Sequence, residues 1–135
     1  MKTIILSVLF SSLFLFNSCT KEDNLLDDNS AREAFIGAWT ANDECAKLTY
    51  GVDIKEDPDN SSQVLIINFA NIGRTANAVI AGNSIYIDSQ EVGGGYTVSG
   101  NGKLNGAIIS WTNYRYENDV ESAEGTATFC NKHNL

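Results

Sequence analysis

The sequence has little of what enzymes usually need. Its 135 residues contain one histidine, His133, which lies two residues from the end, where a chain is expected to fray. No Ser-His-Asp or Cys-His constellation can be built around it. The carboxylates Asp53, Asp88 and Glu117 fall on or beside outward faces of predicted strands, where solvated charge is expected. We therefore expect no enzyme and no cofactor.

Basic residues are also few. The chain has 9 Lys and Arg against 17 Asp and Glu, a net charge of −8, and Lys2 is the one charged residue among the first eighteen. A protein that follows phosphates needs a basic face, so this balance excludes nucleic acid as a partner. The acidic stretch 53–60 lacks the spacing and central glycine of a calcium-binding EF-hand loop. A solvated acidic loop is the preferred interpretation, and no metal site is predicted.

The apolar run near the start is too short to span a membrane. Ile4–Phe16 has 13 residues and follows Lys2, whereas a spanning helix needs roughly 20. The small residue Ser18 then directly precedes Cys19. This arrangement resembles a bacterial lipoprotein signal, although an anchor helix or an ordinary secretory signal is the alternative. The resemblance implies cleavage before Cys19 and a diacylglyceryl group on its sulfur.

The residues after Cys19 form a second predicted targeting signal. Thr20-Lys21-Glu22-Asp23 is similar to the surface-export signal of Bacteroidetes lipoproteins; the alternative is a generic polar tether. We therefore expect a signal peptide over 1–18, a lipidated acidic tether over 19–34 and one folded domain over 35–135. The protein is predicted to be held in the outer membrane by lipid and displayed at the cell surface.

Two cysteines remain besides Cys19. In an exported chain, an even remainder favours a disulfide between Cys45 and Cys130. The predicted strand order places these residues near opposite rims, however, so two separate thiols are the alternative.

The remaining pattern is that of strands joined by tight turns. One proline and eleven glycines accompany many Thr, Val, Ile and Tyr, and no helical period of useful length follows residue 40. Strands are predicted at 36–41, 47–55, 63–69, 75–81, 84–90, 96–102, 106–117 and 122–131, after a possible helical turn at 31–35. Eight strands with short links predict an antiparallel up-and-down barrel, because closure removes both sheet edges. A β-sandwich is the rival, but it usually needs a longer crossover.

A family resemblance agrees with this fold. Gly37-Ala38-Trp39 in the first strand, followed by seven more strands, resembles the calycin group of lipocalins, fatty-acid-binding proteins and avidins. Together with QVLIINF, GNSIYI and GYTVSGNG, it is also similar to small lipocalin-like lipoproteins of Bacteroidetes. The resemblance implies that Trp39 plugs one end of the barrel. It also implies a basic residue over this Trp, a role that the sequence assigns to neither Arg115 nor Lys132.

Aromatic residues are the candidates for binding. Trp39, Tyr50, Phe69 and Tyr96 are predicted to point into the barrel, Tyr86 is predicted to point outward, and the direction of Trp111, Tyr114 and Tyr116 is left open.

A small exported barrel of this kind is compatible with two functions. One is non-enzymatic binding of a small apolar molecule, a glycan or a protein partner at the barrel mouth. The other is a structural or accessory subunit of an outer-membrane assembly, with a filled barrel. Large side chains at every layer would favour the second, whereas Ala76, Ala78, Gly100 and Ala127 would leave room for a ligand.

Overall fold

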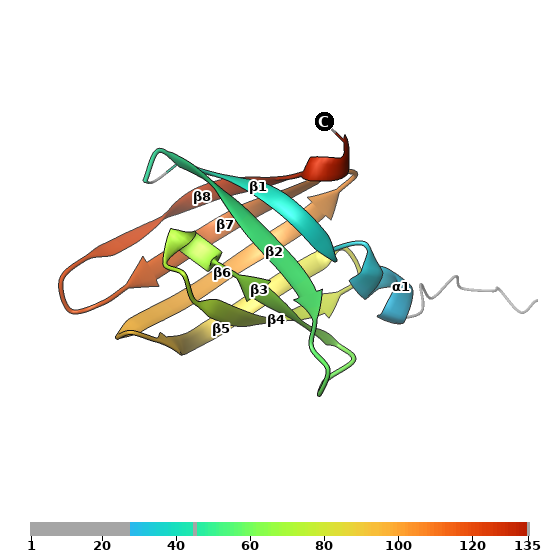
Figure 1. The fold of residues 1–135 in the computed structure, drawn as a ribbon, viewed down its shortest axis with the longest axis horizontal. Coiled ribbons are helices and arrows are strands. Elements are labelled where there is room, and N and C mark those ends of the chain that lie inside the picture. Colours follow the sequence, from blue (N-terminus) through green and yellow to red (C-terminus); the bar gives the residue numbers. More distant parts are fainter. Residues whose placement is uncertain (1–27, 45, 135) are drawn as a thin grey trace, which may run out of the picture.

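The computed structural model describes residues 28–44 and 46–134, which form a closed barrel of eight antiparallel strands (Figure 1). The elements are α1 (Asp28–Glu33), β1 (Gly37–Asp43), β2 (Leu48–Glu56), β3 (Gln63–Ile67), η1 (Phe69–Asn71), β4 (Thr75–Ala81), β5 (Ser84–Gly93), β6 (Tyr96–Asn105), β7 (Ile108–Glu117), β8 (Ser122–Asn131) and η2 (Lys132–Asn134). Each strand pairs with its neighbour in sequence, and β8 pairs with β1. The predicted up-and-down barrel is confirmed. Among the described residues, no helix is long and apolar enough to cross a membrane.

Alternating apolar residues build the barrel wall. In β4, Ala76, Ala78 and Ile80 are buried while the residues between them are exposed. Gly82 then takes a φ of +59°, which glycine adopts without steric cost, and the chain returns as β5. This hairpin lies where the Gly-Asn link predicts it.

The barrel has two different ends. At one, which we call the closed end, α1 lies beside the strand ends (Figure 1), and Phe35, which follows α1 in the chain, is fully buried. Trp39 is also fully buried, and its indole Nε1 donates a hydrogen bond to the Phe35 carbonyl oxygen at 2.9 Å. At the other end, the mouth, lie the β1–β2, β3–β4, β5–β6 and β7–β8 connections. The β3–β4 connection contains η1.

The structure corrects the prediction for the third strand. That strand ends at Ile67 rather than Phe69, because Asn68 takes a left-handed φ of +67°. Its side-chain amide donates to the Gly51 carbonyl at 2.9 Å, and its Oδ1 accepts the Gly73 N–H at 2.9 Å, which stabilises the turn. Phe69 still points inward as predicted, but it does so from η1 and not from a strand.

A β-bulge fixes the direction of the residues in β7. Trp111 and Tyr114 are both buried although they are three positions apart, because the register shifts between them and Asn113 adopts a φ of +51°. Strict alternation cannot place both residues inside, which is why the sequence leaves this strand unsettled.

Candidate functional site at the barrel mouth

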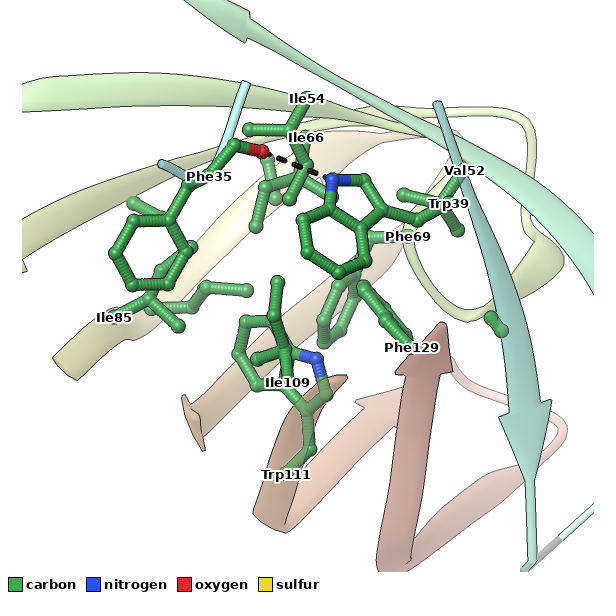
Figure 2. Close-up of a cluster of buried hydrophobic side chains, with 14 of the residues drawn as sticks. Phe35, Trp39, Val52, Ile54, Ile66, Phe69, Ile85, Ile109, Trp111 and Phe129 are labelled. Atoms are coloured by element: carbon green, nitrogen blue, oxygen red, sulfur yellow. Dashed lines mark hydrogen bonds between the residues drawn. The ribbon is translucent and has the colours of Figure 1, made fainter. Parts of the chain in front are cut away.

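Aromatic side chains occupy the middle of the barrel interior (Figure 2). The Phe69 ring centroid lies 5.6 Å from that of Trp111 and 4.3 Å from that of Tyr114, and Trp111 lies 5.2 Å from Phe129. All four side chains are less than 2 % exposed. Trp111 Nε1 finds no acceptor among the described residues. Burying this N–H group without a hydrogen bond lowers the free energy of unfolding by roughly 1–3 kcal/mol.

The small interior residues adjoin space that larger side chains already fill. A Cβ atom on Gly100 would lie 3.2 Å from Trp111 Cε3, and one on Gly102 would lie 2.6 Å from Ile85 Cγ2. Ala127 is 2 % exposed and pairs with Trp111 across the β7–β8 ladder. Ala76 and Ala78 are equally buried. The glycines therefore accommodate the Trp111 indole and do not mark an open chamber.

A tyrosine pair connects η1 to the barrel wall near the mouth. The Tyr50 and Tyr114 hydroxyl oxygens are 2.7 Å apart, and Tyr114 accepts the Ala70 N–H at 2.8 Å. Burial raises the pKa of both phenols, and the nearby Asp43 carboxylate raises each pKa further. Both hydroxyls are therefore neutral at ordinary pH. Asp43 is itself buried, and its Oδ1 accepts the Ala46 N–H at 3.0 Å.

Above this pair is a hollow of about 340 Å³ that opens at the mouth. Its lining residues come from several of the mouth connections and the strand ends beside them: Ala46, Leu48, Ala70, Asn71, Ile72, Tyr96, Tyr116 and Glu121. The Tyr96 hydroxyl donates to Glu121 Oε1 at 3.2 Å. Tyr96 and Tyr116 are half-buried, and both line the hollow. Four of the five tyrosines thus gather at this end of the barrel.

The five predicted aromatic residues do not form one site. Phe69 and Trp111 are in contact, and Tyr50 joins them through Tyr114. Trp39 belongs to the closed end, where it hydrogen-bonds Phe35. Tyr96 has the predicted inward phase but lies at the rim and is half-exposed, because the barrel ends there.

Several residues at the mouth carry no signal in the sequence. Asn71, Ile72 and Glu121 lie in connections, so no strand period places them. These residues come together because the pairing of the strands brings the β3–β4 and β7–β8 connections to the same end of the barrel.

The closed end holds a buried cation that the sequence did not identify. Arg32 of α1 is 9 % exposed and donates to the Asn60 carbonyl and to Glu56 Oε1, each at 3.4 Å. It ties α1 to the β2–β3 loop. Arg115 instead pairs with Glu117 and Glu124 on the outer surface.

The remaining candidates are hollows on the outer surface and two groups of acidic residues. Two outer-surface hollows of about 470 and 380 Å³ share Lys103 and Ser110, and the second includes the exposed Tyr86. The acidic residues of this part of the chain do not form one cluster. Asp43 lies at one end of the barrel and the 53–60 segment at the other, since Asp43 pairs with Leu48 while Asp53 pairs with Ala38. Within 28–44 and 46–134, no three His, Cys, Asp or Glu side chains form a group that could hold a metal ion.

Two cysteine predictions fall outside the described residues. Cys19, the predicted lipidation site, and Cys45 both lie there, so lipidation and the disulfide stay predictions. Cys130 is described: it is half-buried, forms no disulfide with another described residue and pairs with Thr40 across the β1–β8 ladder.

Comparison of the chain with protein families, with characterised proteins and with solved structures found no match.

Proposed function

We propose that this chain is a lipid-anchored, non-enzymatic binding protein of the outer membrane, with a lipocalin-like barrel that holds its ligand at the mouth. The observation that carries the proposal is the open hollow bordered by Tyr96 and Tyr116 above a filled interior. Ligand sites are concave and place polar groups that fix the orientation of the ligand beside aromatic side chains, and this hollow combines two tyrosines and Ile72 with the polar Asn71 and Glu121.

The packing beneath the hollow indicates how deep a ligand can lie. Phe69 is 1 % exposed and packs on Trp111 and Tyr114, so a molecule inside the barrel would have to displace an aromatic ring. Interiors packed to this density resist such displacement. The proposal therefore favours a ligand that rests on the mouth over an apolar molecule enclosed within the barrel.

The position of α1 supports an outward-facing mouth. The described chain begins at the closed end with Asp28, and an extended chain between Cys19 and this residue would reach at most about 30 Å. A lipid on Cys19 would thus hold the barrel by its closed end. The mouth would face away from the membrane, toward molecules in the surroundings.

Two measurements test this proposal. Cys19→Ala should release the protein from membranes; continued membrane fractionation and lipid labelling of the variant would refute the anchor. For binding, we would release the full-length lipoprotein from membranes in mild detergent and record native mass spectra. An extra mass should appear with wild type and with the outer-surface control Tyr86→Ala, and it should disappear with Tyr116→Ala. An extra mass that persists in Tyr116→Ala would place the ligand elsewhere.

A second candidate function is an accessory subunit of an envelope assembly, and the filled interior favours it. Leu48 and Val120, 49 % and 93 % exposed, lie at the mouth where a partner protein would make contact. A bare mass in every native spectrum would favour this function. A photo-crosslinker at position 120 should then capture a protein on intact cells, while one at position 86 should not.

A further inference from the structure

We propose that the mouth hollow is a saccharide site that takes a neutral sugar ring. This inference rests on the proposed binding function of the mouth and specifies the chemistry of its ligand. It starts from the two half-buried tyrosines, Tyr96 and Tyr116, which line one cavity together with the apolar Ile72. A sugar ring has an apolar face of C–H groups that packs on an aromatic surface, and a tyrosine can also hydrogen-bond through its hydroxyl.

The polar groups of the hollow suit hydroxyl groups. The Glu121 carboxylate accepts hydrogen bonds and already holds the Tyr96 hydroxyl at 3.2 Å. On η1, Asn71 also lines the hollow; its Oδ1 accepts the Asn68 amide at 3.4 Å, and its own side-chain amide can donate. A sugar hydroxyl both donates and accepts, so it can satisfy an acceptor from the β7–β8 turn and a donor from η1.

Both groups are held in place before a ligand arrives. Glu121 closes a turn in which its N–H donates to Asn118 Oδ1 at 2.8 Å and its carbonyl accepts the Asn118 N–H at 2.8 Å. On the other side, Ala70 and Asn71 adopt left-handed φ values of +54° and +58°, and Tyr114 holds the Ala70 N–H. Non-glycine residues in this conformation cost of order 1 kcal/mol and concentrate at ligand sites. Such fixed groups reduce the entropy cost of binding.

Charge selects against anionic ligands. None of the residues that line the hollow is basic, and Glu121 is acidic. A carboxylate, phosphate or sulfate would therefore meet repulsion without a compensating cation. The volume of about 340 Å³ falls near the lower bound of roughly 300 Å³ for small-ligand sites. The hollow thus fits one uncharged ring of a longer chain, whose other residues extend into solvent.

The test uses the full-length lipoprotein in phosphatidylethanolamine nanodiscs and saturation-transfer NMR. The probes are neutral gluco-, manno- and xylo-hexasaccharides, with hexagalacturonate as the anionic counterpart and decaproline and dodecanoate as non-saccharide competitors. At least one neutral hexasaccharide should bind saturably, and at least tenfold more tightly than hexagalacturonate. Tyr96→Ala should weaken binding at least tenfold and Glu121→Gln severalfold, whereas Tyr86→Ala, which alters only the outer surface, should leave it unchanged.

Any of four outcomes would overturn the inference. One is the absence of transfer to every neutral hexasaccharide; another is hexagalacturonate binding of equal strength. The third is saccharide binding that Tyr86→Ala weakens and Glu121→Gln does not. Since Glu121 is exposed and its replacement by Gln keeps its shape, that variant remains informative if Tyr96→Ala fails to fold. Binding of decaproline or dodecanoate that is lost in Tyr96→Ala would refute the saccharide class while the mouth function stands.

Discussion

The substitution Gly102→Ala tests whether the barrel is filled, on which the placement of the ligand depends. The added Cβ would lie 2.6 Å from Ile85 Cγ2 and 3.1 Å from both Ile109 Cγ2 and Trp111 Cδ2. The 2.6 Å contact is too short to persist and forces a shift at Ile85, while Ile109 and Trp111, at 3.1 Å, must each give by a few tenths of an ångström. In a hollow barrel, the same methyl group would meet open space.

The expected cost follows from two opposing effects. Overpacking by one carbon in a dense core costs about 1–3 kcal/mol. Removing glycine from a strand interior gains roughly 0.5–1 kcal/mol, because the unfolded chain loses freedom. We expect Gly102→Ala to lower the free energy of unfolding by about 1–2 kcal/mol. In a domain of this size, each kcal/mol lowers Tm by about 4–8 °C.

Urea melts of wild type and variant would measure this difference, and β2 offers a matched control. Gly51 faces outward, and a Cβ there would meet only the flexible Lys132 Nζ at 3.5 Å. Gly51→Ala should therefore be neutral or slightly stabilising. If Gly102→Ala were as stable as Gly51→Ala, the interior beside Trp111 would have room, and the argument for a filled barrel would fail.

Three further predictions concern the two ends of the barrel. Trp39→Ala should cost roughly 3–5 kcal/mol in a urea melt, because it removes a fully buried ring and the hydrogen bond to Phe35; a cost below about 1 kcal/mol would contradict its burial. Tyr114→Phe should cost about 1–3 kcal/mol, since it leaves the buried Ala70 N–H without its acceptor, and an unchanged urea midpoint would show that this bond contributes nothing. Burial raises the pKa of Tyr50 and Tyr114 above that of unfolded tyrosine, so the contribution of these two phenols to stability should be constant below about pH 9 and should fall as the pH rises through 10. Tyr50→Phe should reduce this fall in urea melts recorded at alkaline pH, and an equal fall in the variant would assign it to other groups.

The sequence predicts the barrel because its strongest signals are local. The bounds of β4 and β8 match their predicted ranges, since turns bound both strands and β4 alternates cleanly. Other strand ends move where a turn signal is ambiguous. Residues 103–105 are predicted as a turn, yet β6 continues to Asn105 and the turn begins at Gly106, whose φ is +61°.

The mouth could not be predicted, because distant contacts set its geometry. Alternation along the third predicted strand groups Phe69 with Leu65 and Ile67, but these two residues lie on the outer face while Val64 and Ile66 are buried. Phe69 points inward because Asn68 and Ala70 are left-handed. No local preference favours that conformation at Ala70, and its N–H is held by Tyr114, 44 residues later in the chain.

This dependence couples ligand binding to the conformation of η1. Ala70 and Asn71 form part of the hollow, and the same two residues adopt the left-handed conformation that Tyr114 stabilises. A ligand on the hollow would contact this conformation and not the unfolded chain, so it would raise stability by RT ln(1 + [L]/Kd), about 2.7 kcal/mol at a hundredfold excess over Kd. By the same linkage, Tyr114→Phe should loosen η1 and thereby weaken ligand binding. This effect would be indirect, because Tyr114 lies beneath the hollow and is not one of the residues that line it. The buried tyrosine pair is thus expected to act on affinity through η1, while Tyr96 and Glu121 act on it by contact.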